Sequence, residues 1–420
     1  MEKDPALYPN ADGGDSPRPA LSRRTMLAGS AAAGLAATAG CLGEESGGED
    51  PELVDRPTVF VFNTGNGSVS LIDVESDSVV ATEPIGMTAS FPSNQFSPGL
   101  TDRPADPLWL NVDDGVRAVS AGPLAELAHI ETGSGANWQE QTPDGETLVV
   151  SAREPVHRQY RIDADRDSET FGEVTDEIDR APEGGRGDND GPGPCDVTIH
   201  PDGEYAYVPD LFGDTLTVID IAAFEIVEQI EVSPEDGTAP EPWMGTAAWD
   251  GQRMLIENNT GATGTESIWD VSDPAEPVET VRLGPDDGFG EGPLTSEIGP
   301  GSAFGYVFTP GTEDVTVVDL VAGEVADRLD LGGSAFVGSW DPGRSKLYVP
   351  VQTAGEVAVI DSERREVVDR IEVGPEPYGA TAATFRVERG GSDVASRMEH
   401  LGGEYETTYC IGECACGHEL

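Results

Sequence analysis

Basic residues are scarce in this chain, which holds 24 lysines and arginines against 79 aspartates and glutamates. The lysines are Lys3 and Lys346 alone. Binding to a nucleic acid requires a basic surface that faces the phosphates, so the composition argues against nucleic acid as a partner. The net charge is −55, so the acidic side chains repel one another strongly at low ionic strength. Molar salt shortens the Debye length to about 3 Å and screens most of this repulsion. The charge balance therefore predicts a protein of an extreme halophile.

Cysteine and long hydrophobic runs are also scarce. Five cysteines in 420 residues are too few for a disulfide-stapled fold. The apolar stretch at 26–40 has 15 residues, which is shorter than the roughly 20 residues that a membrane-spanning helix needs. The hydrophobic content of 37%, arranged in short alternating Val and Ile runs, predicts a packed β-rich core rather than a disordered acidic chain.

The apolar stretch at 26–40 lies between two motifs. Arg23 and Arg24 precede it, and the sequence TAGC, ending at Cys41, follows. This pair of motifs resembles that of lipoproteins exported by the twin-arginine pathway. The resemblance implies that residues 1–40 are a signal, that Cys41 carries lipid, and that the protein is held at the outer face of the cell membrane. Residues 41–57, rich in Gly, Glu, Asp and Ser, predict a flexible acidic tether.

A repeated phrase of short strands and turns occupies residues 58–387, and it is clearest at 201–232. Seven copies recur at spacings of about forty to sixty residues. Each copy is expected to form one four-stranded blade. The blades are expected to stack around an axis, because one small sheet cannot bury both of its faces alone. The copies start near Val59, Trp109, Leu148, Pro201, Met254, Tyr306 and Lys346.

The expected fold is therefore an all-β, seven-bladed β-propeller. The chain enters the ring at a middle strand near Val59, and the last strand, at 379–387, completes the same blade. The repeat resembles the YVTN family of β-propellers, which is common in archaeal surface proteins. An Asp closes one strand of each clear copy and is expected to accept hydrogen bonds from the backbone of the turn that follows; these residues are Asp73, Asp220, Asp319 and Asp361.

Loops that lead into the innermost strands are expected to build one binding face of the ring. The side chains there are mainly aromatic or sulfur-containing, and no nucleophile and base stand at a recognised spacing. Cys195 is predicted to be a core residue, or a soft-metal ligand if it is exposed beside Met244 and His157. The acidic insertion at 163–194 is expected to be a solvated loop. The residues predicted for this face are Trp138, His157, Cys195, Trp243, Met244 and Tyr378.

The tail, 388–420, gathers three of the five cysteines beside a histidine: Cys410, Cys414, Cys416 and His418. Thiolates and an imidazole suit zinc, copper or an iron–sulfur cluster. The spacing matches no standard motif, so a disulfide with one free thiol and a tail without a role stay open.

Two functions follow. The first is a non-enzymatic, monomeric surface propeller that binds an envelope protein, a glycan or a small ligand. The second is a metal-binding redox or metal-handling protein that uses the tail. A propeller enzyme is a weaker third hypothesis, because the sequence offers no recognisable catalytic residues.

Overall fold

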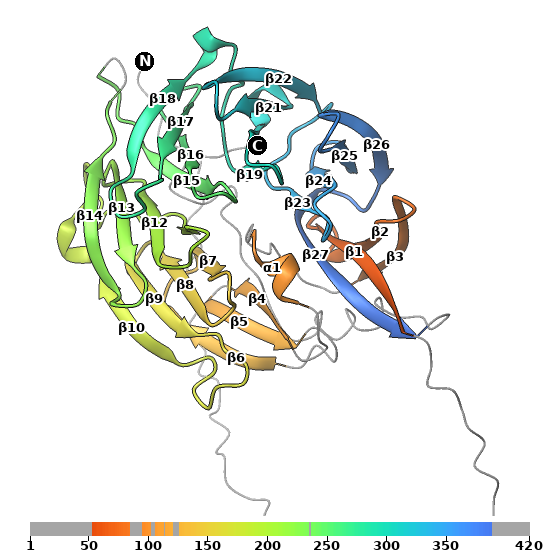
Figure 1. Ribbon diagram of the computed structural model, residues 1–420, viewed down its shortest axis with the longest axis horizontal. Coiled ribbons are helices and arrows are strands. Elements are labelled where there is room, and N and C mark those ends of the chain that lie inside the picture. The colour runs from red at the N-terminus through yellow and green to blue at the C-terminus, as the bar shows by residue number, and fades with distance from the viewer. Residues whose placement is uncertain are drawn as a thin grey trace, which may run out of the picture. The chain divides into compact units, whose positions relative to one another are not determined.

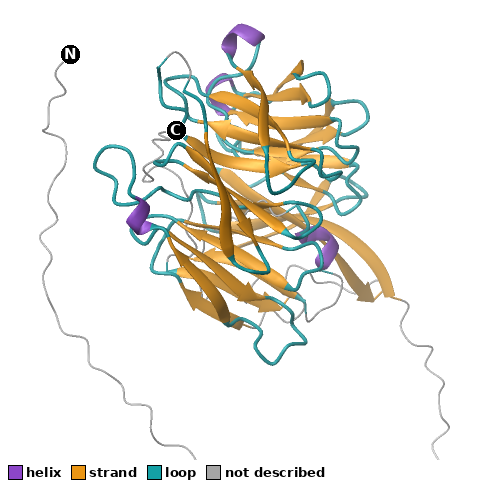
Figure 2. Ribbon diagram, turned by 60° about the vertical axis from the view of Figure 1, so that its left-hand side comes forward, coloured by secondary structure: helices purple, strands orange, loops and turns teal. Residues whose placement is uncertain are grey.

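The computed structural model describes residues 53–84, 95–101, 106–112, 114–120, 126–234 and 237–388. These residues form seven antiparallel sheets arranged as blades in a ring (Figure 1). The predicted seven-bladed, all-β propeller is confirmed. Figure 2 shows that strands and loops make up most of the described chain and that helical turns are short.

Six sheets have four described strands. From the axis outward they are β27 (Pro377–Glu388), β1 (Leu53–Asn63), β2 (Ser68–Asp73) and β3 (Ser78–Pro84); β7 (Asn137–Gln141), β8 (Thr147–Ala152), β9 (Arg158–Asp163) and β10 (Val174–Asp179); β11 (Thr198–Ile199), β12 (Tyr205–Asp210), β13 (Thr215–Asp220) and β14 (Glu225–Glu231); β15 (Pro242–Ala247), β16 (Arg253–Asn258), β17 (Thr265–Asp270) and β18 (Val278–Leu283); β19 (Ser296–Ile298), β20 (Phe304–Thr309), β21 (Asp314–Asp319) and β22 (Glu324–Asp330); and β23 (Ser339–Trp340), β24 (Lys346–Val351), β25 (Glu356–Asp361) and β26 (Glu366–Glu372).

The remaining sheet has three described strands: β4 (Pro107–Val112), β5 (Gly115–Ser120) and β6 (Glu126–Glu131). The helical turn α1 (Ser97–Leu100) lies near the middle of the ring in Figure 1 and contacts β27. Three short 3-10 helices complete the described elements: η1 (Ala181–Glu183), η2 (Pro285–Asp287) and η3 (Pro310–Thr312).

The first and last strands close the ring, as predicted. β1 pairs with β27 from Leu53 opposite Glu388 to Asn63 opposite Pro377, so both ends of the described chain lie in one sheet. β1 begins at Leu53, inside the segment expected to be a tether, because these residues extend the pairing with β27. Five of the predicted repeat starts fall on the second strand from the axis of a four-stranded sheet. The clearest copy starts at Pro201, in the turn before β12, and Trp109 lies on β4, the first of the three described strands of its sheet.

The burial of each strand follows its place in the blade. In β12, every residue except Tyr205 is buried, because neighbouring blades cover both faces of the middle strands. The outermost strand β14 is mostly exposed, with half-buried positions at Ile226 and Ile230. Hydrophobic clusters accordingly lie between adjacent sheets; Phe308 of β20, for example, belongs to the same cluster as Val349 of β24.

The predicted aspartate turns are present. Each Asp carboxylate accepts a backbone N–H from the turn that follows its strand. The donors and distances are Ser76 to Asp73 at 2.9 Å, Ala223 to Asp220 at 2.8 Å, Ala322 to Asp319 at 2.8 Å and Arg364 to Asp361 at 2.8 Å.

Hydrogen bonds also join the inner strand of one blade to that of the next. Four such bonds link successive blades, from the blade that contains β7 to the blade that contains β23. They are Ile199 N–H to Glu140 at 2.6 Å, Gly245 N–H to Asp196 at 2.9 Å, the Thr246 hydroxyl to Ser296 O at 2.9 Å and the Thr295 hydroxyl to Phe336 O at 2.6 Å. The blades are therefore joined by polar contacts near the axis as well as by apolar packing further out.

Candidate functional site

The loops that enter the inner strands surround a small cavity of about 30 Å³ at one end of the ring. Side chains from five sheets line it. Because all inner strands run in the same direction around the ring, their first residues meet at this end. The lining includes Asn137, Trp138, Arg153, Cys195, Trp243, Met244, Leu294 and Tyr378.

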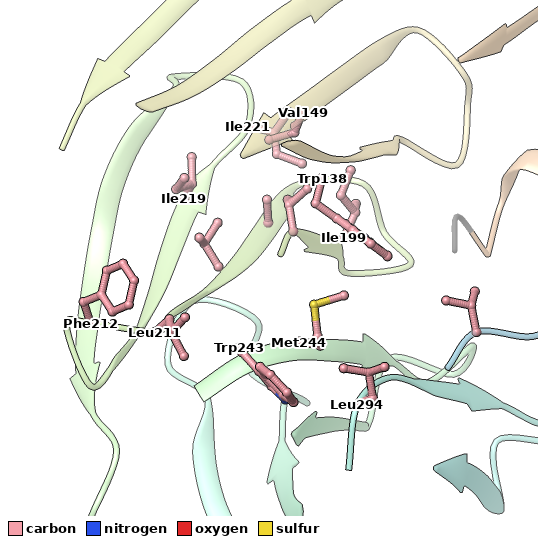
Figure 3. Close-up of a cluster of buried hydrophobic side chains, with 14 of the residues drawn as sticks. Trp138, Val149, Ile199, Leu211, Phe212, Ile219, Ile221, Trp243, Met244 and Leu294 are labelled. Atoms are coloured by element: carbon pink, nitrogen blue, oxygen red, sulfur yellow. The ribbon is translucent and has the colours of Figure 1, made fainter. Parts of the chain in front are cut away.

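Five of the six residues predicted for the binding face line this cavity: Trp138, Cys195, Trp243, Met244 and Tyr378. Figure 3 shows Trp138, Trp243, Met244 and Leu294 gathered around the same part of the core. The walls are largely apolar, and the ring of Tyr378 stacks on Phe336 with centroids 5.3 Å apart. This packing fixes the aromatic walls in place.

His157, the sixth predicted residue, is not among the lining residues of this cavity. Its side chain is buried, and its Nδ1 accepts the backbone N–H of Gly193 at 3.3 Å. Burial lowers the pKa of His157, so the ring is neutral near pH 7. His157 therefore supports the loop before Cys195, and a Cβ at Gly191 would collide with its ring.

Arg153 lines the cavity and was not singled out in the sequence. It is only 1% exposed, and its Nη1 donates to Cys195 Sγ at 3.3 Å. Its Nε donates to a Glu154 carboxylate oxygen at 2.5 Å. The sequence could have indicated a role for Arg153, because this residue directly follows β8 in a chain with few basic residues.

The insertion at 163–194 is anchored by a buried ion pair rather than fully solvated. The guanidinium of Arg180 donates to both carboxylate oxygens of Asp210, at 2.8 and 2.9 Å, and both side chains are 0% exposed. Glu183 and Thr217 also bond to Arg180. Such multiple charge-assisted bonds fix the loop geometry, although the acidic side chains at 188 and 190 remain exposed.

Several buried carboxyl groups surround the axis. Burial raises the pKa of Asp196 to about 7 and that of Glu297 to about 8. Glu257 and Glu266 are opposite each other on β16 and β17, and burial raises both of their pKa values. These groups hold protons at pH values where exposed carboxyl groups are ionised.

The residues predicted for export, lipid attachment and metal binding lie outside the described residues: Arg23, Arg24, Cys41, Cys410, Cys414, Cys416 and His418. Within the described part of the chain, one group of three side chains has the spacing of metal ligands, Asp114, His129 and Glu131. In that part of the chain, no helix is both long enough and apolar enough to cross a membrane.

Comparison with solved structures supports the fold. A periplasmic gluconolactonase of Pseudomonas aeruginosa has a TM-score of 0.60 at 18% identity, covering 78% of this chain and 99% of its own. A protein from Lactobacillus plantarum has a TM-score of 0.61 at 14% identity, with coverage of 78% and 99%. A protein of unknown function from Desulfotomaculum acetoxidans has a TM-score of 0.57 at 12% identity, with coverage of 79% and 99%.

No model of a known protein family matches the chain, and a search of the curated proteins finds no match either. At these identities the likeness shows the propeller fold alone, since propellers of this kind carry different functions.

The buried carboxyl groups predict that stability falls as pH rises. Unfolding lets Asp196 and Glu297 release their protons near pH 4, whereas the folded protein keeps them until about pH 7 and about pH 8. Between these limits each group lowers the free energy of unfolding by up to about 1.4 kcal/mol per pH unit. Urea unfolding at about pH 5 and about pH 8, in molar salt, should show lower stability at the higher pH.

The variant Glu297→Gln should reduce this pH dependence, because the amide does not ionise. Glu225→Gln is the matched control, since Glu225 is exposed on the outer strand β14. Equal pH dependence in Glu297→Gln and the parent protein would contradict the assignment.

Proposed function

We propose that this chain is a lipid-anchored surface β-propeller of a halophilic archaeon, exported by the twin-arginine pathway, that acts as a binding or scaffold module at the outer face of the cell membrane. The anchoring part of the proposal is supported by Arg23, Arg24 and the TAGC sequence that ends at Cys41. The acidic composition supports the halophilic setting.

The binding role rests on the cavity at the entry of the inner strands. Trp138, Trp243 and Tyr378 come from three sheets and supply rigid aromatic walls. A cavity of about 30 Å³ has room for only about one or two water molecules. It suits one apolar group inserted by a larger partner better than a whole substrate or cofactor. This size favours an envelope protein or glycan as the partner.

A non-enzymatic role fits the chemistry of the same residues. Arg153, the charged side chain that lines the cavity, already bonds to Glu154 and Cys195. Among the described lining residues there is no carboxyl or imidazole group that could act as a general base. The gluconolactonase of Pseudomonas aeruginosa shares the fold at 18% identity, which carries no activity over to this chain.

The lipid anchor predicts that Cys41→Ser releases the protein from the membrane, because the serine hydroxyl cannot replace the thiol that accepts the lipid. Membrane and soluble fractions of cells that express each form would be compared. Cys195→Ser is the control and should stay with the membrane. Full membrane retention of Cys41→Ser would rule out the lipid on Cys41.

The binding face predicts that truncating its aromatic walls removes the partner. After cross-linking on intact cells, Trp138→Ala and Trp243→Ala should lose the envelope component that the parent protein captures, with a loss of at least about tenfold. Val80→Ala, at a 61% exposed position on the outer strand β3, is the control. Equal capture by the aromatic variants and the parent would contradict a partner at this cavity.

The second candidate function uses the tail, and the observation that favours it is the clustering of Cys410, Cys414, Cys416 and His418. Thiolates and an imidazole would hold one zinc or copper ion, or contribute to an iron–sulfur cluster. Metal analysis should find about one ion per full-length chain and none in a form that ends at residue 389. A full-length protein without metal, with one disulfide in the tail, would eliminate this function.

A further inference from the structure

A second and larger cavity, of about 210 Å³, lies at the other end of the inner strands. Trp249 follows β15 and Arg344 follows β23, so these side chains come from the exits of the inner strands. The segment before α1 contributes Gln95 and Phe96. None of the residues that line this cavity lines the small cavity described above.

Aromatic groups form one part of its wall. The ring of Phe96 meets the ring of Trp249 edge to face, with centroids 5.7 Å apart. The guanidinium of Arg344 stacks over Trp249, 4.0 Å from the ring centroid. The indole N–H of Trp249 is occupied, because it donates to Ile298 O at 3.0 Å. The Trp249 ring is thus held in place, with Arg344 over one of its faces and Phe96 beside it.

Polar groups that lack good hydrogen bonds within the protein form another part of the wall. Trp340 is 4% exposed, and its indole N–H lies near the carboxyl group of Glu297 without forming a hydrogen bond of normal geometry. Both amide atoms of Gln95 are buried without a partner. Unsatisfied buried groups of this kind are costly, typically by about 1 to 3 kcal/mol each. A ligand that both donates and accepts hydrogen bonds would satisfy them.

The carboxyl group of Glu297 completes the lining and is 5% exposed. Burial raises the pKa of Glu297 to about 8, and the nearby indole of Trp340 lowers it only in part. The group is therefore neutral near pH 7 and can both donate and accept a hydrogen bond. A charged ligand gains little here: a cation would face Arg344, and an anion would lose its hydration in exchange for one guanidinium that is already stacked on Trp249.

We propose that this cavity binds a neutral monosaccharide unit in its pyranose form. The C–H groups of a pyranose pack against aromatic side chains such as Phe96 and Trp249. Its hydroxyl groups match the unpartnered amide of Gln95, the weakly bonded indole N–H of Trp340 and the carboxyl group of Glu297. The site is independent of the lipid anchor and of the binding face at the other end of the ring.

The test uses purified protein in molar salt and neutral methyl glycosides of glucose, mannose, galactose and N-acetylglucosamine. At least one glycoside should bind with a Kd in the millimolar range or tighter. Binding would be measured by calorimetry and by the change in tryptophan emission. Glucuronate and glucosamine are the charged comparators and should bind more weakly. No binding by any neutral glycoside, or stronger binding by a charged comparator, would overturn the proposal.

Two variants locate the binding in the cavity. Trp340→Phe keeps an aromatic ring but loses the N–H, and Gln95→Leu loses both amide atoms at a position outside the described sheets. Each should weaken glycoside binding by about three- to tenfold, as expected for one lost hydrogen bond. Trp109→Phe is the matched control: Trp109 also has a buried, unpartnered indole N–H, but it lies on β4 and does not line the cavity.

Melting curves would confirm that each variant is folded. Because Gln95 stands outside the described sheets, Gln95→Leu keeps the test decisive even if Trp340→Phe destabilises the ring. Glycoside binding of parental strength in a folded Gln95→Leu variant would show that the sugar binds elsewhere and would refute the site.

Discussion

The ring depends on contacts between inner strands, because no single blade can bury both of its faces. A carboxyl or hydroxyl side chain of one inner strand bonds to the backbone of the next, as Glu140 does with Ile199 and Asp196 with Gly245. The carboxyl groups that make these bonds are buried, and burial raises their pKa values. The contacts that join the blades therefore also make the stability of the ring sensitive to protonation.

The same inner strands determine where ligands can bind. Their first residues bring Trp138, Trp243 and Tyr378 to one end of the ring, and the residues at and beyond their other ends bring Trp249 and Trp340 to the opposite end. The two ends differ in chemistry. The small cavity is mainly apolar and suits an inserted group, whereas the larger cavity holds unsatisfied polar groups. The two proposed sites thus differ in chemistry and share no lining residue.

The repeat made most of the fold predictable, because its turns and strand lengths are local features. The strand starts and the turns at Asp220 and Asp361 followed from that pattern. The cavity at the strand entries was also predictable, since position in the repeat assigns a residue to the inner strand. Features that depend on distant contacts were not, including the Arg180 to Asp210 pair and the position of His157 behind Gly193. Gln95 and Trp340 are far apart in the sequence and line the same cavity only because the ring closes, so no local pattern revealed that site.

The sheet that closes the ring has a mechanical consequence. Leu53 and Glu388 are paired at the same end of β1 and β27, so the chain enters and leaves this sheet side by side. A force that pulled the two ends apart would load the Leu53–Glu388 pair first and then each following pair in turn. The strands would separate by peeling, which requires much less force than sliding all of their hydrogen bonds apart together. The closing sheet is therefore the part of the ring that is loaded first when both ends are pulled.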